Sequence, residues 1–346
     1  LRGNIFLPLN EKYLYLYQHN MNLRKSFKYV ASRPEFAALT IFIIIAITFY
    51  VINENFLNFR NLRVLLTISP EIALIAMGAT ILMVSGEFDL SVGSVFALSG
   101  VVMVVLTNEG INAHLAFTIA LLMCIVIGYI NAIITIKFGI PSFIATLGTM
   151  FMVRSIAIVI VKADFPTFPM EEMYWLRAIF ANPIPGTIFR MSFIWFILIT
   201  ILLIFYLHRS NYGNWSYSTG ANQAAAKAMG VNTNNVKIRN FILCSFLAGL
   251  AGIFMVLRTR AAFPSVGVGY ELQAIAASVI GGASLFGGIG TVFGACVGAF
   301  LLKFLDNGLV MARLDVNWFR FAVGTLLIFA VIANTNLRKI ANKMRD

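Results

Sequence analysis

Charged side chains that interrupt long apolar runs are the residues of this sequence most suited to chemistry. A charge at membrane depth is costly, so it usually faces a cavity, a polar solute or an oppositely charged partner. Such groups could contact a solute or couple the movement of an ion to transport. The set comprises Glu87, Asp89, Arg154, Glu271, Lys303, Asp306 and Arg320.

Structural explanations compete with functional ones for several of these charges. Lys303 and Asp306 share one helix face, so they could simply neutralise each other. Arg154 could form a structural pair with a carboxylate on another span. Asp89 precedes Leu-Ser-Val-Gly and could open the next helix as a cap or turn residue, or it could border a translocation path.

Enzymatic chemistry is not indicated by the remaining reactive residues. The histidines are scattered, and each cysteine lies inside an apolar run, as a small buried hydrophobe does. The sequence has no Gly-x-x-x-x-Gly-Lys-Ser/Thr segment, hence no phosphate-binding loop of that kind. We therefore expect no catalytic residue, metal or cofactor in this chain. These residues are His19, His114, His208, Cys124, Cys244 and Cys296.

Composition indicates which elements must position these side chains. The chain has 346 residues, of which 60% are hydrophobic and 12% are charged, whereas soluble domains carry roughly 25% charge. Such a chain needs a lipid bilayer as its solvent. The net charge of +12 does not predict nucleic-acid binding, because the basic residues lie in tails and loops beside apolar runs, as the positive-inside bias produces.

The apolar runs predict an all-α integral membrane protein of about ten transmembrane helices, because a bilayer core needs roughly 20 apolar residues per helix. The runs 71–85 and 271–285 are short, and glycine-rich polar stretches follow them. This pattern indicates short or broken helices beside a cavity. Eight or nine spans would result if 71–107 or 271–311 folded back. The predicted spans are 36–52, 71–85, 91–107, 113–136, 140–161, 191–207, 237–257, 271–285, 290–311 and 317–333.

Lysine and arginine are most frequent in the segments that lie inside when the amino terminus is cytoplasmic. We therefore expect both termini to be cytoplasmic. Residues 1–20 are left out of the fold prediction because the first methionine is Met21. The predicted divisions are a tail over 1–35, a transmembrane domain over 36–333 with an inner loop at 208–236 and an outer loop at 162–190, and a tail over 334–346.

Two repeated patterns concern helix packing and duplication. Gly290, Gly294 and Gly298 allow close helix approach, within the chain or at a subunit interface. Glu71-Ile-Ala-Leu-Ile-Ala-Met and Glu271-Leu-Gln-Ala-Ile-Ala-Ala are alike, and a similar Gly-x-Val-Phe segment follows each of them. Internal duplication, which is common in transporters, would explain the likeness; convergence of two glycine-bounded hairpins is the alternative.

The inner loop has the sharpest local pattern. Between Gly220 and Gly230 the chain reads Ala-Asn-Gln-Ala-Ala-Ala-Lys-Ala-Met. Alanine favours helix, and the bounding glycines allow the chain to turn. A short helix with small side chains could be held in a groove of another protein, or it could pack only on its own bundle.

This segment, followed by Val231-Asn-Thr and an apolar span, resembles the cytoplasmic coupling loop of bacterial ABC importer permeases of the ribose-type sugar family. Three further segments resemble that family in the same order, so that the likeness covers roughly 70–310. The chain departs from the family at Gln273, where Asp is usual, and at Glu87-Phe88, where smaller residues are usual. The three segments are Gly86-Glu-Phe-Asp-Leu-Ser-Val-Gly-Ser94, Pro141-Ser-Phe-Ile-Ala-Thr-Leu-Gly-Thr-Met150, and Gly269-Tyr-Glu-Leu-Gln-Ala-Ile-Ala-Ala with Gly281-Gly-Ala-Ser-Leu-Phe-Gly-Gly.

The resemblance implies a permease subunit in the bacterial inner membrane whose ATP hydrolysis takes place in other chains. It implies as partners two cytoplasmic ATPase subunits or one tandem ATPase, an identical or sister permease subunit, and a periplasmic sugar-binding protein. The residues implied to couple to the ATPases are Gly220, Ala221, Asn222, Ala224, Ala225, Lys227, Ala228 and Gly230.

The translocation path is expected to offer hydrogen-bonding groups to sugar hydroxyls without forming a tight cage, because a path must release its cargo. In this family selectivity resides largely in the binding protein, so the sequence does not identify the sugar. The residues expected to border the path are Asp89, Ser91, Asn131, Phe143, Thr146, Thr149, Glu271 and Asn307.

The sequence therefore predicts the permease subunit of an ATP-driven importer of a monosaccharide or related polyol. The alternative is a secondary transporter driven by an ion gradient. Its support is the carboxylates Asp89, Glu271 and Asp306 and the internal likeness, but it does not explain the alanine-rich loop.

Overall fold

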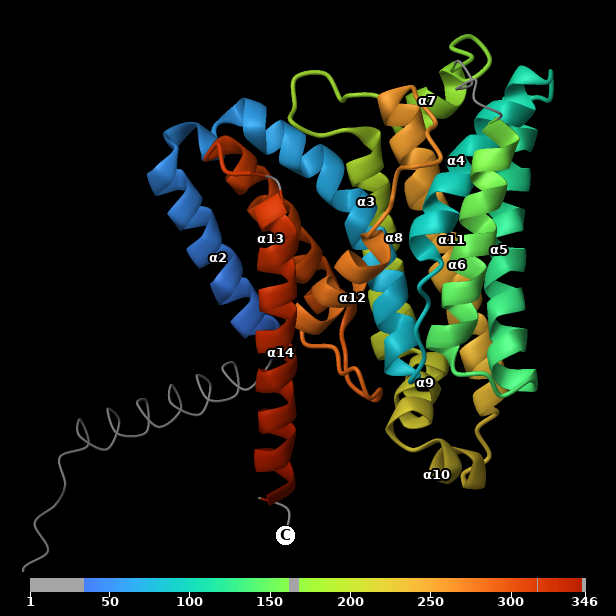
Figure 1. The fold of residues 1–346 in the computed structure, drawn as a ribbon, viewed down its shortest axis with the longest axis vertical. Coiled ribbons are helices and arrows are strands. Elements are labelled where there is room, and N and C mark those ends of the chain that lie inside the picture. Colours follow the sequence, from blue (N-terminus) through green and yellow to red (C-terminus); the bar gives the residue numbers. More distant parts are fainter. Residues whose placement is uncertain (1–33, 162–167, 316, 344–346) are drawn as a thin grey trace, which may run out of the picture.

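The computed structural model describes residues 34–161, 168–315 and 317–343, and these form an all-helical bundle (Figure 1). The predicted tail over 1–35, with its segment 1–20, lies almost wholly outside the described residues. The elements are α2 (Pro34–Ile52), the 3-10 helix η1 (Glu54–Leu57), α3 (Phe59–Val84), α4 (Val92–Asn108), α5 (Ala113–Lys137), α6 (Ser142–Val161), α7 (Tyr174–Phe180), α8 (Met191–Arg209), α9 (Asn211–Ala221), α10 (Gln223–Ala228), α11 (Thr233–Thr259), α12 (Tyr270–Ile280), α13 (Val292–Met311) and α14 (Asn317–Lys343).

Polar residues explain where several long helices begin. The side chain of Asn58 accepts a hydrogen bond from a backbone N–H in the first turn of α3, Asn112 does so for α5, and Thr291 does so for α13. These bonds satisfy N–H groups that have no partner within the helix. The long helices alternate in direction between the end that carries α7 and the end that carries α10, here called the α7 end and the α10 end (Figure 1).

Each predicted apolar run coincides with a helix. The helices long and apolar enough to cross a membrane are α3, α5, α6, α8, α11 and α13, while α2, α4, α12 and α14 contain shorter apolar stretches. The prediction of a short helix at 71–85 was wrong, because α3 starts at Phe59 and continues through Pro70 for 26 residues. The prediction for 271–285 was correct, since α12 has 11 residues. The predicted tail over 334–346 is helical as far as Lys343.

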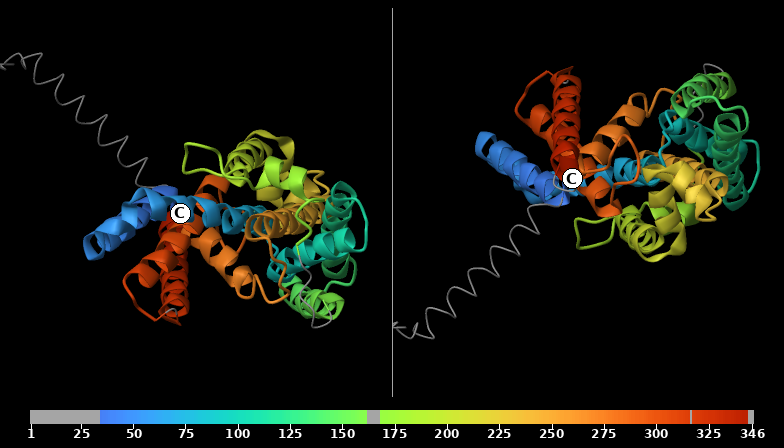
Figure 2. Two further views of the ribbon diagram at one scale, coloured as in Figure 1. Left: turned by 90° about the horizontal axis from the view of Figure 1, so that it is seen from above. Right: turned by 90° about the horizontal axis from the view of Figure 1, so that it is seen from below.

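The helices α3 and α11 form the centre of the bundle. They pack against each other, with α12, α13 and α8 around α3 and with α4 and α5 around α11. Viewed along the bundle, α2 and α14 lie at one side and α4, α5 and α6 at the other (Figure 2). Large apolar side chains are exposed on the outer helices, as expected for a surface that faces lipid. Examples are Val51, Leu122, Val159, Leu202 and Phe329.

Both central helices are followed by a non-helical segment that leads into another helix of the bundle (Figure 1). Residues 85–91 connect α3 to α4, and residues 260–269 connect α11 to α12. The positions of Glu71 and Glu271 argue against duplication as the reason for their similar surrounding sequences. Glu71 lies in the middle of the long helix α3, whereas Glu271 lies in the first turn of the short helix α12.

The glycine ridge on α13 is used within the chain. A Cβ atom placed on Gly294 would lie 2.0 Å from the carbonyl oxygen of Gly281, and one on Gly298 would lie 2.0 Å from that of Ala277. The close approach of α12 and α13 therefore requires glycine at these positions. The predicted packing within the chain is confirmed for Gly294 and Gly298, whereas Gly290 lies before the start of α13.

We expect Gly298→Ala to lower stability by about 1–3 kcal/mol, the usual cost of an overpacked site. Gly148→Ala is the matched control, because a Cβ at this helical glycine meets no atom within 4 Å. Thermal unfolding of the two purified variants in the same detergent measures the difference. Equal unfolding temperatures would contradict the packing role of Gly298.

Candidate functional site

The alanine-rich helix predicted in the loop is α10, at the α10 end of the bundle (Figure 1). Asn222 separates it from α9, and its Oδ1 accepts a hydrogen bond of 3.0 Å from the N–H of Ala225. Gly230 follows α10 with a φ of 85°, a conformation that favours glycine. The local sequence therefore fixes both ends of this short helix.

Most of the predicted coupling residues face away from the bundle. Only Ala226 of this segment is buried against its own chain, and Gly220 is half-buried. Met229, just beyond the helix, is 84% exposed, which makes it an apolar side chain without cover in the described residues. The exposed members of the predicted set are Ala221, Asn222, Ala224, Ala225, Lys227, Ala228 and Gly230.

Gly220 has a role different from the turn that its sequence position suggests. It lies within α9, where a Cβ atom would come 1.9 Å from the carbonyl oxygen of Val84 at the end of α3. Tyr217 of the same helix donates a hydrogen bond of 2.6 Å to the carbonyl oxygen of Gly290. Thus α9 is attached to the bundle, whereas α10 presents a free surface of small side chains.

Asp89 is the centre of a buried polar cluster in the segment 85–91. Its Oδ1 accepts hydrogen bonds from the N–H of Ser91 at 2.8 Å and from the Ser91 hydroxyl at 2.6 Å. The hydroxyl of Ser245 on α11 donates to Oδ2 at 3.2 Å, and the Nδ2 of Asn131 on α5 donates to the Ser91 hydroxyl oxygen at 3.0 Å. The geometry is that of a turn residue that opens α4, which was one of the two predicted roles of Asp89.

Hydroxyl groups of α6 hold the same segment from its other side. The Thr146 hydroxyl oxygen accepts a hydrogen bond of 3.0 Å from the N–H of Leu90, and the Ser142 hydroxyl oxygen accepts one of 3.1 Å from that of Phe88. Thr149 donates to the carbonyl oxygen of Thr146. The structure thus brings five predicted path residues together, namely Asp89, Ser91, Asn131, Thr146 and Thr149.

The other three predicted path residues lie elsewhere. Phe143 is 55% exposed on α6. Asn307 on α13 accepts a hydrogen bond of 2.8 Å from Asn61 on α3. The carboxylate of Glu271 accepts one of 3.1 Å from the N–H of Gly269 at the start of α12.

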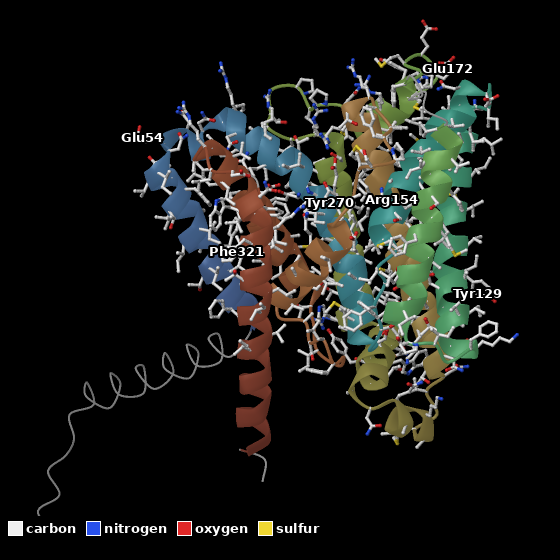
Figure 3. All side chains as sticks on the ribbon, in the orientation of Figure 1. Glu54, Tyr129, Arg154, Glu172, Tyr270 and Phe321 are labelled. Carbon is white, nitrogen blue, oxygen red and sulfur yellow. The ribbon has the colours of Figure 1, made fainter. Side chains whose placement is uncertain are left out.

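Arg154 of α6 is bonded to backbone carbonyl groups. It donates to the carbonyl oxygens of Val266 at 2.7 Å and Gly93 at 3.0 Å, and to that of Pro264. The carboxylate partner predicted for Arg154 does not bond to it directly. The Glu271 carboxylate is near enough only for its charge to act on the guanidinium. Arg154 therefore fastens the segment 260–269 to the start of α4, well inside the bundle (Figure 3).

Within the described part of the chain, three ion pairs involve the buried charges. Lys303 lies 3.6 Å from Asp306 on the same helix, which confirms that these two neutralise each other, and Lys303 also reaches Gln273 at 3.4 Å. Arg258 of α11 binds both carboxylate oxygens of Glu71 on α3, at 2.7 and 3.0 Å. Sequence reasoning missed this pair and the pair of Lys237 with Glu87 at 2.6 Å, because their members are far apart in the sequence. The remaining charge, Arg320, is exposed on α14.

Arginines gather at the α7 end. Arg63, Arg177 and Arg190 donate hydrogen bonds to the carbonyl oxygens of Thr187, Leu257 and Ala181. Burial lowers the pKa of Arg190, and the charges of neighbouring arginines lower it further. Positive charge is therefore concentrated around Arg190.

Comparison with known proteins identifies the family of this chain. The family model for the permease component of the branched-chain amino acid transport system matches residues 61–331. The ribose import permease protein of Escherichia coli K12 is 34% identical over 297 residues, which is 86% of this chain and 92% of that protein. The ribose import permease protein of Haemophilus influenzae is 32% identical over 317 residues, covering 90% of this chain and 95% of that protein.

A third relative is named for the import of a different molecule. The autoinducer 2 import system permease protein of Photorhabdus luminescens is 30% identical over 318 residues, covering 92% of this chain and 94% of that protein. No solved structure matches this chain significantly. The matches to whole permeases and the apolar helices make this chain a multi-pass inner-membrane protein. The chain belongs to the permease family of bacterial ABC importers, with the ribose-type permeases among its relatives.

Proposed function

We propose that this chain is the membrane-spanning subunit of an ATP-driven importer that carries a monosaccharide or a related small polyol across the bacterial inner membrane. The observation that carries the proposal is α10, a capped helix of exposed small side chains beyond the bundle. Such a surface suits the groove of a partner protein. The relatives that import ribose and autoinducer 2 support a small polyhydroxylated cargo.

The proposed topology has ten spans with both termini in the cytoplasm. The spans are α2, α3, α4, α5, α6, α8, α11, α12, α13 and α14, whose alternating directions support an even count (Figure 1). In this topology the α10 end faces the cytoplasm and the α7 end faces the periplasm. The short helices α4 and α12 reach full depth together with the segments 85–91 and 260–269.

Energy for transport comes from other chains in this proposal. Two cytoplasmic ATPase subunits, or one tandem ATPase, bind α10 and hold the nucleotide, while this chain holds no cofactor. A second permease subunit, identical or a sister chain, completes the membrane path. A periplasmic sugar-binding protein docks at the α7 end, where the arginine cluster suits an acidic surface.

In this proposal the path is bordered by the non-helical segments 85–91 and 260–269. Asp89, Ser91, Asn131, Thr146 and Thr149 hold the segment 85–91 in place, and Phe143, Glu271 and Asn307 lie at other positions along the proposed route. Irregular backbone at membrane depth is tolerated where it is buried in protein or lines a cavity. This supports a path beside the 85–91 and 260–269 segments.

Cysteine labelling tests the proposed topology and the docking surface. We expect Met229→Cys to react with a membrane-impermeant maleimide in inverted vesicles but not in spheroplasts, and to react faster after urea has removed peripheral proteins. The native cysteines are buried, so their background should be low. Glu172→Cys, at the exposed α7 end (Figure 3), is the control with the opposite sidedness. Labelling of Met229→Cys in spheroplasts would overturn the orientation.

A further inference from the structure

The helix α10 is connected to the interior of the bundle by side chains as well as by the chain itself. Gln223, its first residue, receives a hydrogen bond of 3.1 Å from the Nζ of Lys237 on α11. The amide of Gln223 also donates to the Thr233 hydroxyl at 3.3 Å. These contacts fix the start of α10 to the first turns of α11.

Lys237 continues this connection into the segment 85–91. Its Nζ lies 2.6 Å from the Oε1 of Glu87. The Lys237 ammonium group has three N–H donors. It thus contacts α10 through Gln223 and the segment 85–91 through Glu87. Gln223 and Glu87 are far apart in the sequence, and their side chains meet through Lys237, beside the direct backbone contact of Gly220 with the end of α3.

The Glu87–Lys237 pair is shielded from water. The Glu87 side chain is 11% exposed and that of Lys237 is 12% exposed. Exposed ion pairs contribute little because water screens them, but removal of one partner from a shielded pair leaves a desolvated charge. The pair should therefore move as a unit when either side is displaced.

Glu87 directly precedes the anchored part of its segment. Phe88 and Leu90 are held by hydroxyl groups of α6, and Asp89 is held by Ser91 and by Ser245 of α11. A displacement of Lys237 relative to α6 therefore pulls on the backbone just before the start of α4.

We infer that Gln223, Lys237 and Glu87 form a relay that transmits displacement of α10 to the segment 85–91, with Lys237 as its positioning residue. The inference rests on the proposed function, in which ATPase movement displaces α10. In other conformational transitions, small shifts become large because packed interfaces switch between two discrete arrangements. The relay differs from a static brace because it predicts that nucleotide binding changes the 85–91 segment only while the three side chains are connected.

The test is hydrogen–deuterium exchange of the full complex, purified from its host with its ATPase partner, with and without ATP and vanadate. In the unmodified complex we expect ATP to change exchange in peptides covering 222–229 and 85–91. In Lys237→Gln and in Gln223→Ala, the change at 222–229 should persist while that at 85–91 falls about fivefold or more, the lower end of an allosteric coupling. Gln223→Ala leaves no unpaired charge, so it remains informative if Lys237→Gln folds poorly.

Two further variants complete the design. The exchanged pair Glu87→Lys with Lys237→Glu should restore the response at 85–91, because it restores the ion pair in reverse. Lys137→Gln, which removes an exposed lysine at the end of α5, should leave both responses unchanged.

The outcomes separate the relay from the proposed function. Single variants that keep the full ATP response at 85–91, or an exchanged pair that fails to restore it, would overturn the relay alone. An unmodified complex without any ATP response at 222–229 would overturn the proposed coupling role of α10, and with it the relay.

Discussion

Ala225→Trp should strongly reduce uptake while the amount of protein inserted in the membrane stays unchanged. Ala225 is exposed on α10, so a larger side chain meets little of its own chain. In the proposed complex the same position faces the ATPase groove, where an indole overpacks the contact at a cost of about 1–3 kcal/mol. Because 1.4 kcal/mol is about tenfold in an equilibrium constant, we expect roughly a tenfold or larger loss of uptake of radiolabelled pentoses and hexoses.

The control for Ala225→Trp is Leu122→Trp, on the exposed outer face of α5 and away from both docking ends. It adds the same side chain and should retain uptake. Gly230 is a less suitable site for the same test, because its φ of 85° penalises any larger residue irrespective of a partner. Normal uptake by Ala225→Trp at normal protein level would remove α10 as the coupling element.

Arg258→Met should strongly destabilise the protein. The guanidinium makes two hydrogen bonds to Glu71, whose side chain is only 5% exposed. The substitution leaves this carboxylate buried without its cation, and breaking a buried pair in this way costs about 3–5 kcal/mol. The measurement is thermal unfolding in detergent together with the amount of protein in the membrane.

The double variant Glu71→Leu with Arg258→Met tests whether the stability loss comes from the unpaired Glu71 carboxylate. Apolar replacement of both partners is often neutral, so the double variant should recover most of the stability that Arg258→Met loses. Arg320→Met, which removes an exposed arginine of α14, should change little. A double variant that is less stable than Arg258→Met would mean that the ion pair is not the source of the effect.

The helices were largely predictable from the sequence because every span needs an apolar run long enough to cross the lipid bilayer. Apolar runs of sufficient length located each long helix. The exception was the first part of α3, where Asn61 and Arg63 interrupt the apolar pattern. In the structure Asn61 donates a hydrogen bond to Asn307, and Arg63 donates one to the carbonyl oxygen of Thr187. Composition shows that a side chain is polar but not that a neighbouring helix satisfies it.

The coupling loop was predictable for a different reason. Asn222, the alanines and Gly230 act over one or two turns, so local sequence determines α10. The connections of Arg154, Arg258 and Lys237 were not predictable, since each depends on which distant segment faces the helix. Helical periodicity gives the faces of one helix and not its neighbours, and for this reason Arg154 was expected to meet a carboxylate and instead binds carbonyl groups.

The assignment as an importer subunit is tested most directly by purification of the tagged chain from its native host in mild detergent, followed by identification of the proteins that remain bound. The proposed function predicts an ATP-binding subunit in about equal amount, or one tandem ATPase per two permease chains, and its loss in Ala225→Trp but not in Leu122→Trp. A chain that purifies alone and still moves sugar into liposomes under an ion gradient would contradict the assignment. The buried carboxylate Asp89 would then become the leading candidate for ion coupling.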